Sequence, residues 1–296
     1  MNLLNSVRAG LFLAISSILA GAIVRATGSG DGCGSTWPTC KGKVIPELSD
    51  IPELIEFSHR AVSGILLVVT LMIFLKTRDL EKNNLKKVIS NYLTFFVVLE
   101  AVIGAVIVLF EWVGLNSSLP RIVAVPIHLV NTFGLLACFI ALYKVVKDDL
   151  QSIKGIVDNQ FLVVLCLFLF SGATGSITAL ADVLFPSESF IQGFMEDFDE
   201  TSELLTRLRI LHPIVASLLS ISLFFESNRL KKTYKLNTKS LKLMVLVAVT
   251  LGVVNVLSNI WLPLSVLHLA IADFLWITYI YVSIEKTRNN LSINSL

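Results

Sequence analysis

Residues 56–75 read EFSHRAVSGILLVVTLMIFL, a short polar stretch with a histidine followed by 15 residues without a charged side chain. The apolar core of a bilayer is crossed by about 20 consecutive, mainly apolar residues in a helix. Backbone groups in lipid must be satisfied within the segment, and a β-barrel would instead show alternating segments of about ten residues. We therefore predict that this stretch is a transmembrane α-helix with His59 near its beginning.

Seven further apolar runs are of the same kind. The chain of 296 residues is 54% hydrophobic and only 16% charged, which is far from the composition of soluble domains. We predict an all-α, polytopic membrane protein with eight transmembrane helices, the last of which contains one acid, Asp273. The predicted spans are Leu11–Val24, Val62–Leu75, Leu93–Val108, Ile122–Leu142, Phe161–Leu180, Ile210–Phe225, Leu243–Leu257 and Leu262–Ile284.

The first run shares features with a secretory signal peptide, because Arg8 precedes it and Ala20-Gly21-Ala22 lies near its end. The run continues to Val24, however, and seven more spans follow it, so we expect a retained helix. An Arg-rich and Ser-rich transit peptide is missing. We therefore expect a bacterial plasma membrane rather than an organelle.

Lysines and arginines are distributed unequally between the two sides that the spans define. With the amino terminus in the cytoplasm, 17 of the 24 fall on the cytoplasmic side, as the positive-inside rule expects. Both termini are then cytoplasmic, whereas the first long loop and the acidic stretch Glu196–Glu203 lie outside. The net charge of +2 reflects this topology, so the lipid bilayer is an expected partner and nucleic acid is not.

Short motifs recur between the two halves of the chain. We predict two pseudo-symmetric four-helix bundles, residues 1–150 and 151–296, as in membrane proteins built from internal repeats. A four-helix bundle can hold a cofactor between facing side chains. The paired motifs are Glu56-Phe-Ser-His59 with Arg209-Ile-Leu-His212, and Pro126-Ile-His128-Leu with Val266-Leu-His268-Leu.

All four histidines of the chain lie near the beginning of even-numbered spans, so they are expected at similar depth near the outer face. An ionisable side chain inside a span points to a function. One pair in each half, His59 with His128 and His212 with His268, suits axial ligation of heme iron. Zinc fits less well, because its sites need three or four ligands. Hydrogen bonding between helices remains the structural alternative.

Glu56 distinguishes the first half from the second. It lies three residues before His59, so the two side chains share a helix face. Di-iron bundles need two such Glu-x-x-His motifs, but the second half has Arg209 at the matching place. A carboxylate beside only one iron site is what a reacting site would have. The alternative role for Glu56 is to stabilise the positive end of the helix dipole.

Three arginines lie at the same outer level as the histidines. Guanidinium groups pair with carboxylates through two hydrogen bonds, so these arginines are candidates to bind heme propionates. Snorkelling toward the membrane surface is the equally weighted alternative. The three are Arg60, Arg207 and Arg209.

The first outer loop is rich in glycine but lacks the P-loop pattern, so phosphate binding is not expected. Cys33 and Cys40 flank a Trp-Pro turn in this loop, on the oxidising side of the membrane. We expect a disulfide between them, which either staples the loop or exchanges electrons. Cys138 and Cys166 lie in apolar spans and are expected to be buried, small hydrophobic residues.

Motifs spread from the first span to the last are shared with one known family. They are Gly21-Ala-Ile-Val-Arg25-Ala-Thr-Gly-Ser-Gly, Cys33, Trp37-Pro38, Cys40, Gly42, Glu56-x-x-His59-Arg60, His128-Leu-Val-Asn131, Thr174-Gly-Ser-Ile-Thr-Ala-Leu-Ala-Asp182, Phe185-Pro186, His212-Pro213 and His268-Leu269. No single motif is specific, but the combination resembles the heme A synthase family.

The resemblance implies conversion of heme O to heme A for terminal oxidases. One porphyrin methyl group would be oxidised to a formyl group by two hydroxylations and loss of water. His212 and His268 would hold a heme b cofactor, whereas His59, His128 and Glu56 would handle the substrate heme. Heme O synthase and an electron donor are then expected partners.

Two other functions stay open at this point. A b-type membrane cytochrome would carry one or two unreactive bis-histidine hemes, although the difference between Glu56 and Arg209 argues against it. A heme carrier would be expected to have charged or broken helices near the bilayer midplane. The spans are clean there, with Glu100 as the main exception.

Overall fold

The computed structural model describes residues 2–46 and 49–293, with side chains described as far as Thr287. Over these residues the chain is helical, and its extended pairing is limited to a single bridge between Cys40 and Lys43. Eight of the described helices are long and apolar enough to cross a membrane. The all-α architecture with eight spans is therefore confirmed.

Each span corresponds to one predicted apolar run and extends beyond it at one end or both. The extension arises because polar flanks also continue a helix. For example, α1 starts at Leu3, and the side chain of Asn2 caps it by accepting a hydrogen bond from the N–H of Asn5 at 2.8 Å. The spans are α1 (Leu3–Ala26), α2 (Ile51–Thr77), α3 (Leu85–Leu109), α4 (Leu119–Lys147), α5 (Asn159–Leu184), α8 (Leu211–Tyr234), α9 (Lys239–Leu257) and α10 (Leu262–Ile293).

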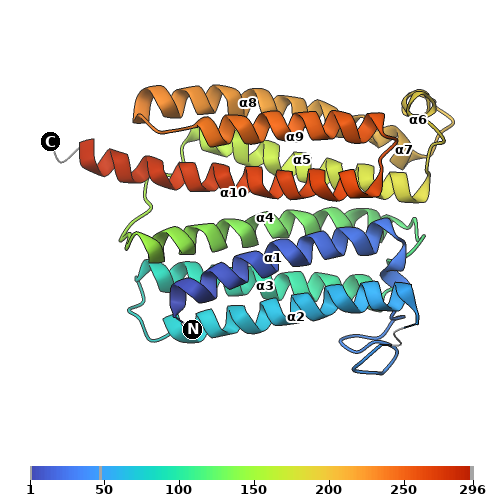
Figure 1. Cartoon of the computed structure of the whole chain (residues 1–296), viewed down its shortest axis with the longest axis horizontal. Coiled ribbons are helices and arrows are strands. Elements are labelled where there is room, and N and C mark those ends of the chain that lie inside the picture. Colours follow the sequence, from blue (N-terminus) through green and yellow to red (C-terminus); the bar gives the residue numbers. More distant parts are fainter. Residues whose placement is uncertain (1, 47–48, 294–296) are drawn as a thin grey trace.

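Three short elements lie in the loops at one end of the molecule, η1 (Ser29–Asp31), α6 (Phe190–Glu196) and α7 (Leu204–Leu208). In Figure 1 this end carries the loop between α1 and α2 together with α6 and α7, whereas the start of α1 lies at the opposite end. The end with α6 and α7 is the one that the sequence analysis assigns to the outer face.

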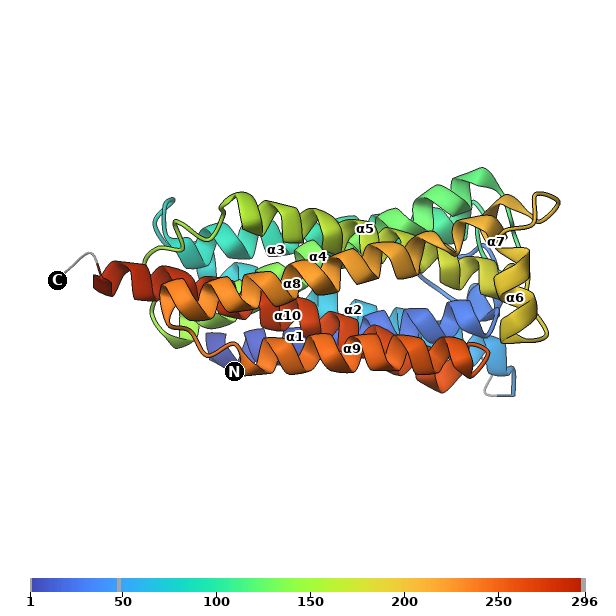
Figure 2. The ribbon, with the colours of Figure 1, turned by 90° about the horizontal axis from the view of Figure 1, so that it is seen from above.

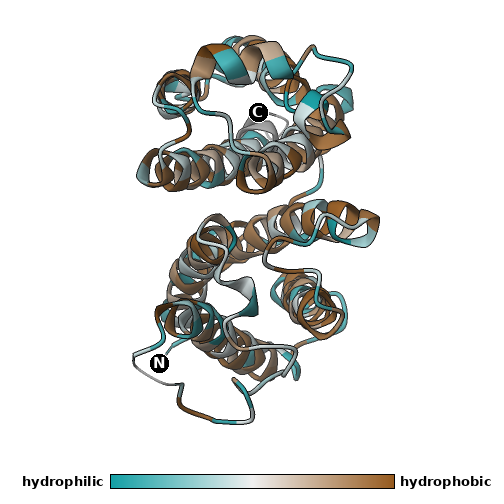
Figure 3. Ribbon diagram, turned by 90° about the vertical axis from the view of Figure 1, so that its right-hand side faces the viewer, coloured by the Kyte–Doolittle hydropathy of each residue, from teal (hydrophilic) through white to brown (hydrophobic). Residues whose placement is uncertain are grey.

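The spans form two sets that run along a common long axis. Figure 1 shows α1–α4 on one side and α5, α8, α9 and α10 on the other, and the end-on view shows two groups of helices, one above the other (Figure 3). Seen from above, the second set lies over the first (Figure 2). Neighbouring spans contact one another within each set, while α4 contacts α5 and α10 across the middle. The pseudo-symmetry of the two halves, and their division at residue 150, stay predictions.

An aromatic cluster fills the middle, where α4, α5 and α10 meet. The rings of Phe168 and Trp276 pack edge to face with centroids 4.8 Å apart, and Phe133 and Tyr279 pack around them. Trp276 is buried, and its indole N–H donates to the carbonyl of Phe133 at 2.9 Å. This satisfies the polar atom that burying a tryptophan would otherwise leave unpaired.

The outer surface of the spans is largely apolar, as expected for side chains that face lipid. Phe95 of α3, Phe170 of α5 and Leu246 of α9 are all exposed on it. Cys166 of α5 is also exposed, whereas Cys138 is partly buried. The expectation that both free cysteines are buried is therefore wrong for Cys166, because an apolar run in a membrane helix also has a lipid-facing side.

Candidate functional site

The four histidines lie on α2, α4, α8 and α10, and all four imidazoles are half-buried. The ring centroids of His212 and His268 are 6.4 Å apart, with the ring planes at 78°. An imidazole–metal bond is about 2.0–2.1 Å long, so this separation leaves room for one metal ion bonded to both rings. The second pair therefore fits bis-histidine ligation of a heme iron.

Each histidine ring is seated against a glycine of a neighbouring span. A Cβ atom at Gly21, Gly175 or Gly252 would come within 3.1 Å of the facing ring, and one at Gly104 would lie at 3.7 Å. Glycine inside a helix costs about 0.5–1 kcal/mol relative to alanine. The close approach of the imidazole explains the glycine at Gly21, Gly175 and Gly252, whereas a Cβ atom at Gly104 would make only an ordinary contact. The pairs are Gly21–His59, Gly104–His128, Gly175–His212 and Gly252–His268.

In the first set, His128 also has a carboxylate partner. Its Nδ1 lies 3.2 Å from Oε1 of Glu100, although the geometry is not that of a regular hydrogen bond. The amide nitrogen of Asn131 donates to Glu100 at 2.5 Å and to the carbonyl of Phe96 at 2.9 Å, which holds the carboxylate in place. A histidine that binds a metal commonly has a carboxylate at its other ring nitrogen. The arrangement leaves Nε2 of His128 as the ligating atom.

The corresponding positions of the second set are apolar. Ala248 lies four residues before Gly252, as Glu100 does before Gly104, and Ile271 lies three residues after His268, as Asn131 does after His128. The carboxylate and the amide are therefore replaced together. Glu100 is a site residue that was not predicted, although an acid within a span is itself a signal of function.

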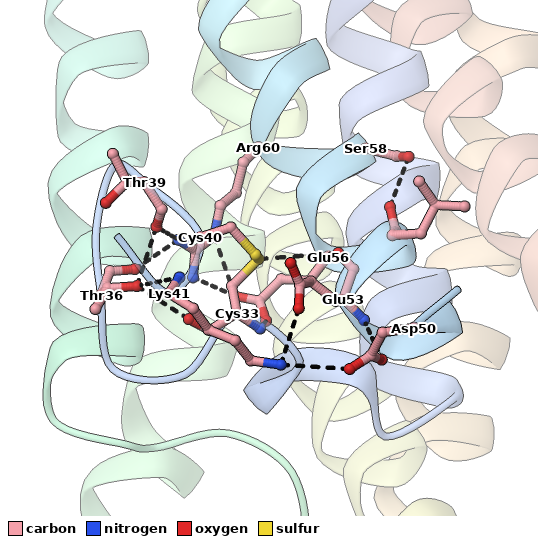
Figure 4. Close-up of a disulfide and its surroundings, with 11 residues drawn as sticks. Cys33, Thr36, Thr39, Cys40, Lys41, Asp50, Glu53, Glu56, Ser58 and Arg60 are labelled. Atoms are coloured by element: carbon pink, nitrogen blue, oxygen red, sulfur yellow. Dashed lines mark hydrogen bonds and ion pairs between the residues drawn. A yellow bond between two sulfur atoms is a disulfide. The ribbon is translucent and has the colours of Figure 1, made fainter. Parts of the chain in front are cut away.

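Glu56 is buried at the outer end of α2 and is fixed from two sides. Its Oε2 accepts a hydrogen bond from the backbone N–H of Cys33 at 2.8 Å, and its Oε1 forms an ion pair with Arg60. Arg60 in turn donates to the carbonyls of Thr36 and Thr39, at 2.6 and 2.7 Å. Figure 4 shows the outer loop gathered against Glu56 and Arg60 in this way.

The Cys33–Cys40 disulfide is confirmed and closes this loop. Lys41, which follows it, donates to Glu53 at 2.9 Å and to Asp50 at 3.3 Å. Hydrogen bonds to these two acids raise the pKa of Lys41 above its ordinary value. The N-cap residue of α2 is Asp50, which accepts from the N–H of Glu53 at 3.2 Å. The loop, the helix start and Glu56 are thus one connected unit.

The three arginines predicted for propionate binding have different surroundings. Arg60 is bonded to Glu56, whereas Arg207 is exposed. Arg209 is buried and paired with Asp182, Asp197 and Glu196, at 3.2, 2.8 and 3.4 Å. Their role toward propionates stays a prediction.

A fourth arginine was missed as a site candidate, although it lies in the first shared motif. Arg25 lies near the outer end of α1, and its buried Nε has no hydrogen-bond partner among the described residues. A buried guanidinium nitrogen without a partner is available to an anion. Arg25 is therefore a further candidate for propionate binding.

Residues 7–280 match the model of a family described as cytochrome oxidase assembly protein. The chain belongs to this family. A relative from Staphylococcus carnosus named heme A synthase is 25% identical over 299 residues, which cover 92% of each chain. Another heme A synthase, from Staphylococcus aureus strain Newman, is 43% identical over 94 residues, or 31% of each chain.

A relative from Thermus thermophilus is named protoheme IX farnesyltransferase. It is 34% identical over 275 residues, which cover 90% of this chain but 45% of the relative. The chain thus spans about half the length of this relative.

Proposed function

We propose that this chain is a heme A synthase, which oxidises a methyl group of heme O to a formyl group. The family and the two staphylococcal relatives support this activity. The observation that carries the proposal is the difference between the two histidine pairs. Glu56 and Glu100 accompany the first pair, whereas Arg209 and Ala248 stand at the matching places of the second. Methyl oxidation needs groups that handle protons and charge, and electron transfer alone does not.

His212 and His268 are the residues that would hold the heme b cofactor. The 6.4 Å separation of their rings and the glycine seats support this assignment. A heme bound between two histidines supplies one-electron chemistry at its iron. The chain itself holds the two rings in position. At the place where the first set has the Glu100 carboxylate, the second set has an apolar side chain.

His59 and His128 would orient the substrate heme near Glu56. Each hydroxylation replaces a C–H bond of the methyl group by a C–OH bond, with an oxidant that supplies the oxygen atom and an electron donor as co-reactants, and a fixed carboxylate can accept the proton released or stabilise positive charge at the methyl carbon. The Cys33 N–H and Arg60 prevent the Glu56 carboxylate from rotating away. The disulfide then acts mainly as a clamp that keeps the loop on Glu56.

The substrate and the longer Thermus relative together support a partnership with heme O synthase. Heme O carries a farnesyl-derived chain, and that relative is named for the transfer of such a chain. We infer that heme O is handed over within the bilayer, and that an electron donor completes the reaction. A multi-pass position in a bacterial plasma membrane, with both termini cytoplasmic, fits the distribution of basic residues.

Expression with a heme O synthase, followed by chromatography and mass detection of extracted hemes, tests the proposal. Heme A or its hydroxymethyl intermediate should appear only when this chain is present. Heme O alone, beside a folded and heme-loaded chain and a supplied electron donor, would instead support the cytochrome or carrier function. Neither of these is favoured by the names of the relatives.

A further inference from the structure

An apolar groove lies between α2 and α3 of the first set. Its volume is about 310 Å³, and it is lined by Leu67 of α2, by Trp37 of the outer loop and by a row of small and branched residues on α3. The α3 residues that matter here are Val98, Ala101, Val102 and Ala105. Val98 and Val102 are exposed, so the groove opens toward lipid.

On α3, the groove lining is adjacent in sequence to Gly104, which faces the His128 ring. Ala101 and Ala105 flank Gly104 on this helix. The outer end of the groove is formed by Trp37, which lies between Cys33 and Cys40 in the loop that contacts Glu56. A ligand held by His128 could therefore extend a side group into the groove without leaving the site.

The second set has bulkier side chains at two of the matching positions. Counted from the glycine that faces the histidine ring, Ala101 and Ala105 of α3 correspond to Val249 and Val253 of α9. Each valine carries two more carbon atoms than alanine, so α9 has bulkier side chains than α3 at these two positions. A ligand with an extra side group would therefore find more room at these positions in the first set than in the second.

We propose that this groove binds the isoprenoid chain of heme O. The inference rests on the proposed function and adds the means by which the first set selects its substrate. An isoprenoid chain has no charge and gains from apolar contact alone, which is what the lining offers. Protoheme has only a vinyl group at that place and leaves the groove unfilled. The second set, with valines, suits the heme that lacks the chain.

A competition experiment with three variants tests the proposal. The purified chain with its resident heme b, which is itself protoheme, is incubated with equal amounts of heme O and isotopically labelled protoheme, and the retained heme O and labelled protoheme are extracted and quantified. The double variant Ala101→Val/Ala105→Val gives α3 the side chains found on α9. Trp37→Ala removes the loop side chain that closes the outer end of the groove and leaves the helices unchanged. Val249→Ala/Val253→Ala is the matched control on α9.

The unmodified chain should retain heme O in preference to protoheme. In Ala101→Val/Ala105→Val the ratio of heme O to protoheme should fall on the order of tenfold, with protoheme retention unchanged. Trp37→Ala should lower the ratio less, and the α9 control should not lower it.

Three results would overturn the inference. An unchanged ratio in both groove variants would mean that the groove holds a lipid acyl chain only, even if the unmodified chain makes heme A. An equal fall in the α9 control would show a general packing effect. A chain that keeps its resident heme but neither binds nor converts heme O would remove the proposed function and the groove assignment together.

Discussion

At the scale of single residues, Glu56 is the group on which the chemistry depends most directly. Glu56→Gln keeps the volume and the contact with the Cys33 N–H but removes the charge. We expect normal heme content and a loss of heme A formation of about 10²-fold or more, the usual contribution of a positioned acid or base. Heme extraction and activity measured on the same membranes check this, and unimpaired conversion would exclude the role.

Glu100 is expected to act through His128. Glu100→Ala removes the carboxylate at Nδ1 and leaves Asn131 without its partner. Loss of such a contact typically weakens metal binding roughly 10–100-fold, so heme O binding to the first set should weaken by that factor while the resident heme is unchanged. The absorption spectrum and midpoint potential of the first-set heme should shift as well. A normal affinity with a normal spectrum would show that Glu100 has no influence on the ligand.

The close contact between Gly175 and the His212 ring gives a prediction, and Gly64 provides a control in the same molecule. Gly175→Ala places a methyl group 2.9 Å from the His212 ring and should displace it, with loss of the resident heme. Gly64→Ala, on α2, meets no atom within 4 Å and should raise stability by about 0.5–1 kcal/mol. Heme content and thermal unfolding of both variants distinguish crowding from a general effect of alanine. Full heme content in Gly175→Ala would contradict the claim that the His212 ring needs a glycine at this position.

At the scale of helices and loops, short-range caps fix where α2 and α5 begin, but ion pairs between distant residues fix how they pack. Asp158 caps α5 by accepting from the N–H of Phe161 at 2.8 Å, and it also pairs with Lys286 at 2.7 Å and with Arg229 at 3.0 Å. Burial alone would raise the pKa of Asp158, but these hydrogen bonds lower it to about 2. The start of α5 is thereby tied to α8 and α10.

A lowered pKa in the folded state means that the ionised Asp158 stabilises the fold above its ordinary pKa of 3.8, and that this contribution is lost as the pH falls toward 2. Asp158→Asn should cost on the order of 1 kcal/mol above pH 4, since the site is partly exposed, and should flatten the pH dependence between 4 and 2. Thermal unfolding in detergent across this range tests it. Asp79→Asn, in an exposed pair with Arg78, is the control and should change little.

At the scale of the whole molecule, the two sets of helices should lose heme independently. His268→Ala removes one ring of the 6.4 Å pair and should abolish the resident heme, whereas His59→Ala should retain it but fail to convert heme O. Heme content measured by the pyridine hemochrome spectrum separates the two. The reverse pattern would exchange the assignment of cofactor and substrate between the sets.

The eight spans followed from the sequence by itself, which also predicts a common depth for the four histidines. Both depend on properties that are local along the chain, namely runs of apolar residues long enough for a bilayer and the place of each histidine within a run. The Cys33–Cys40 disulfide could equally be predicted from the sequence, because its two cysteines are seven residues apart. The burial of Cys166 was predicted wrongly, since hydropathy alone does not say which side of a helix faces lipid.

Only the tertiary structure decided which groups surround each histidine. The glycine seats, the contact of Glu100 with His128 and the hydrogen bond from Cys33 to Glu56 join residues from different helices and loops. Such contacts depend on how side chains from separate elements pack, and no local pattern encodes that packing. The membrane determines that the helices form, whereas the packing between them determines that Glu100 contacts His128 and that the loop holds Glu56.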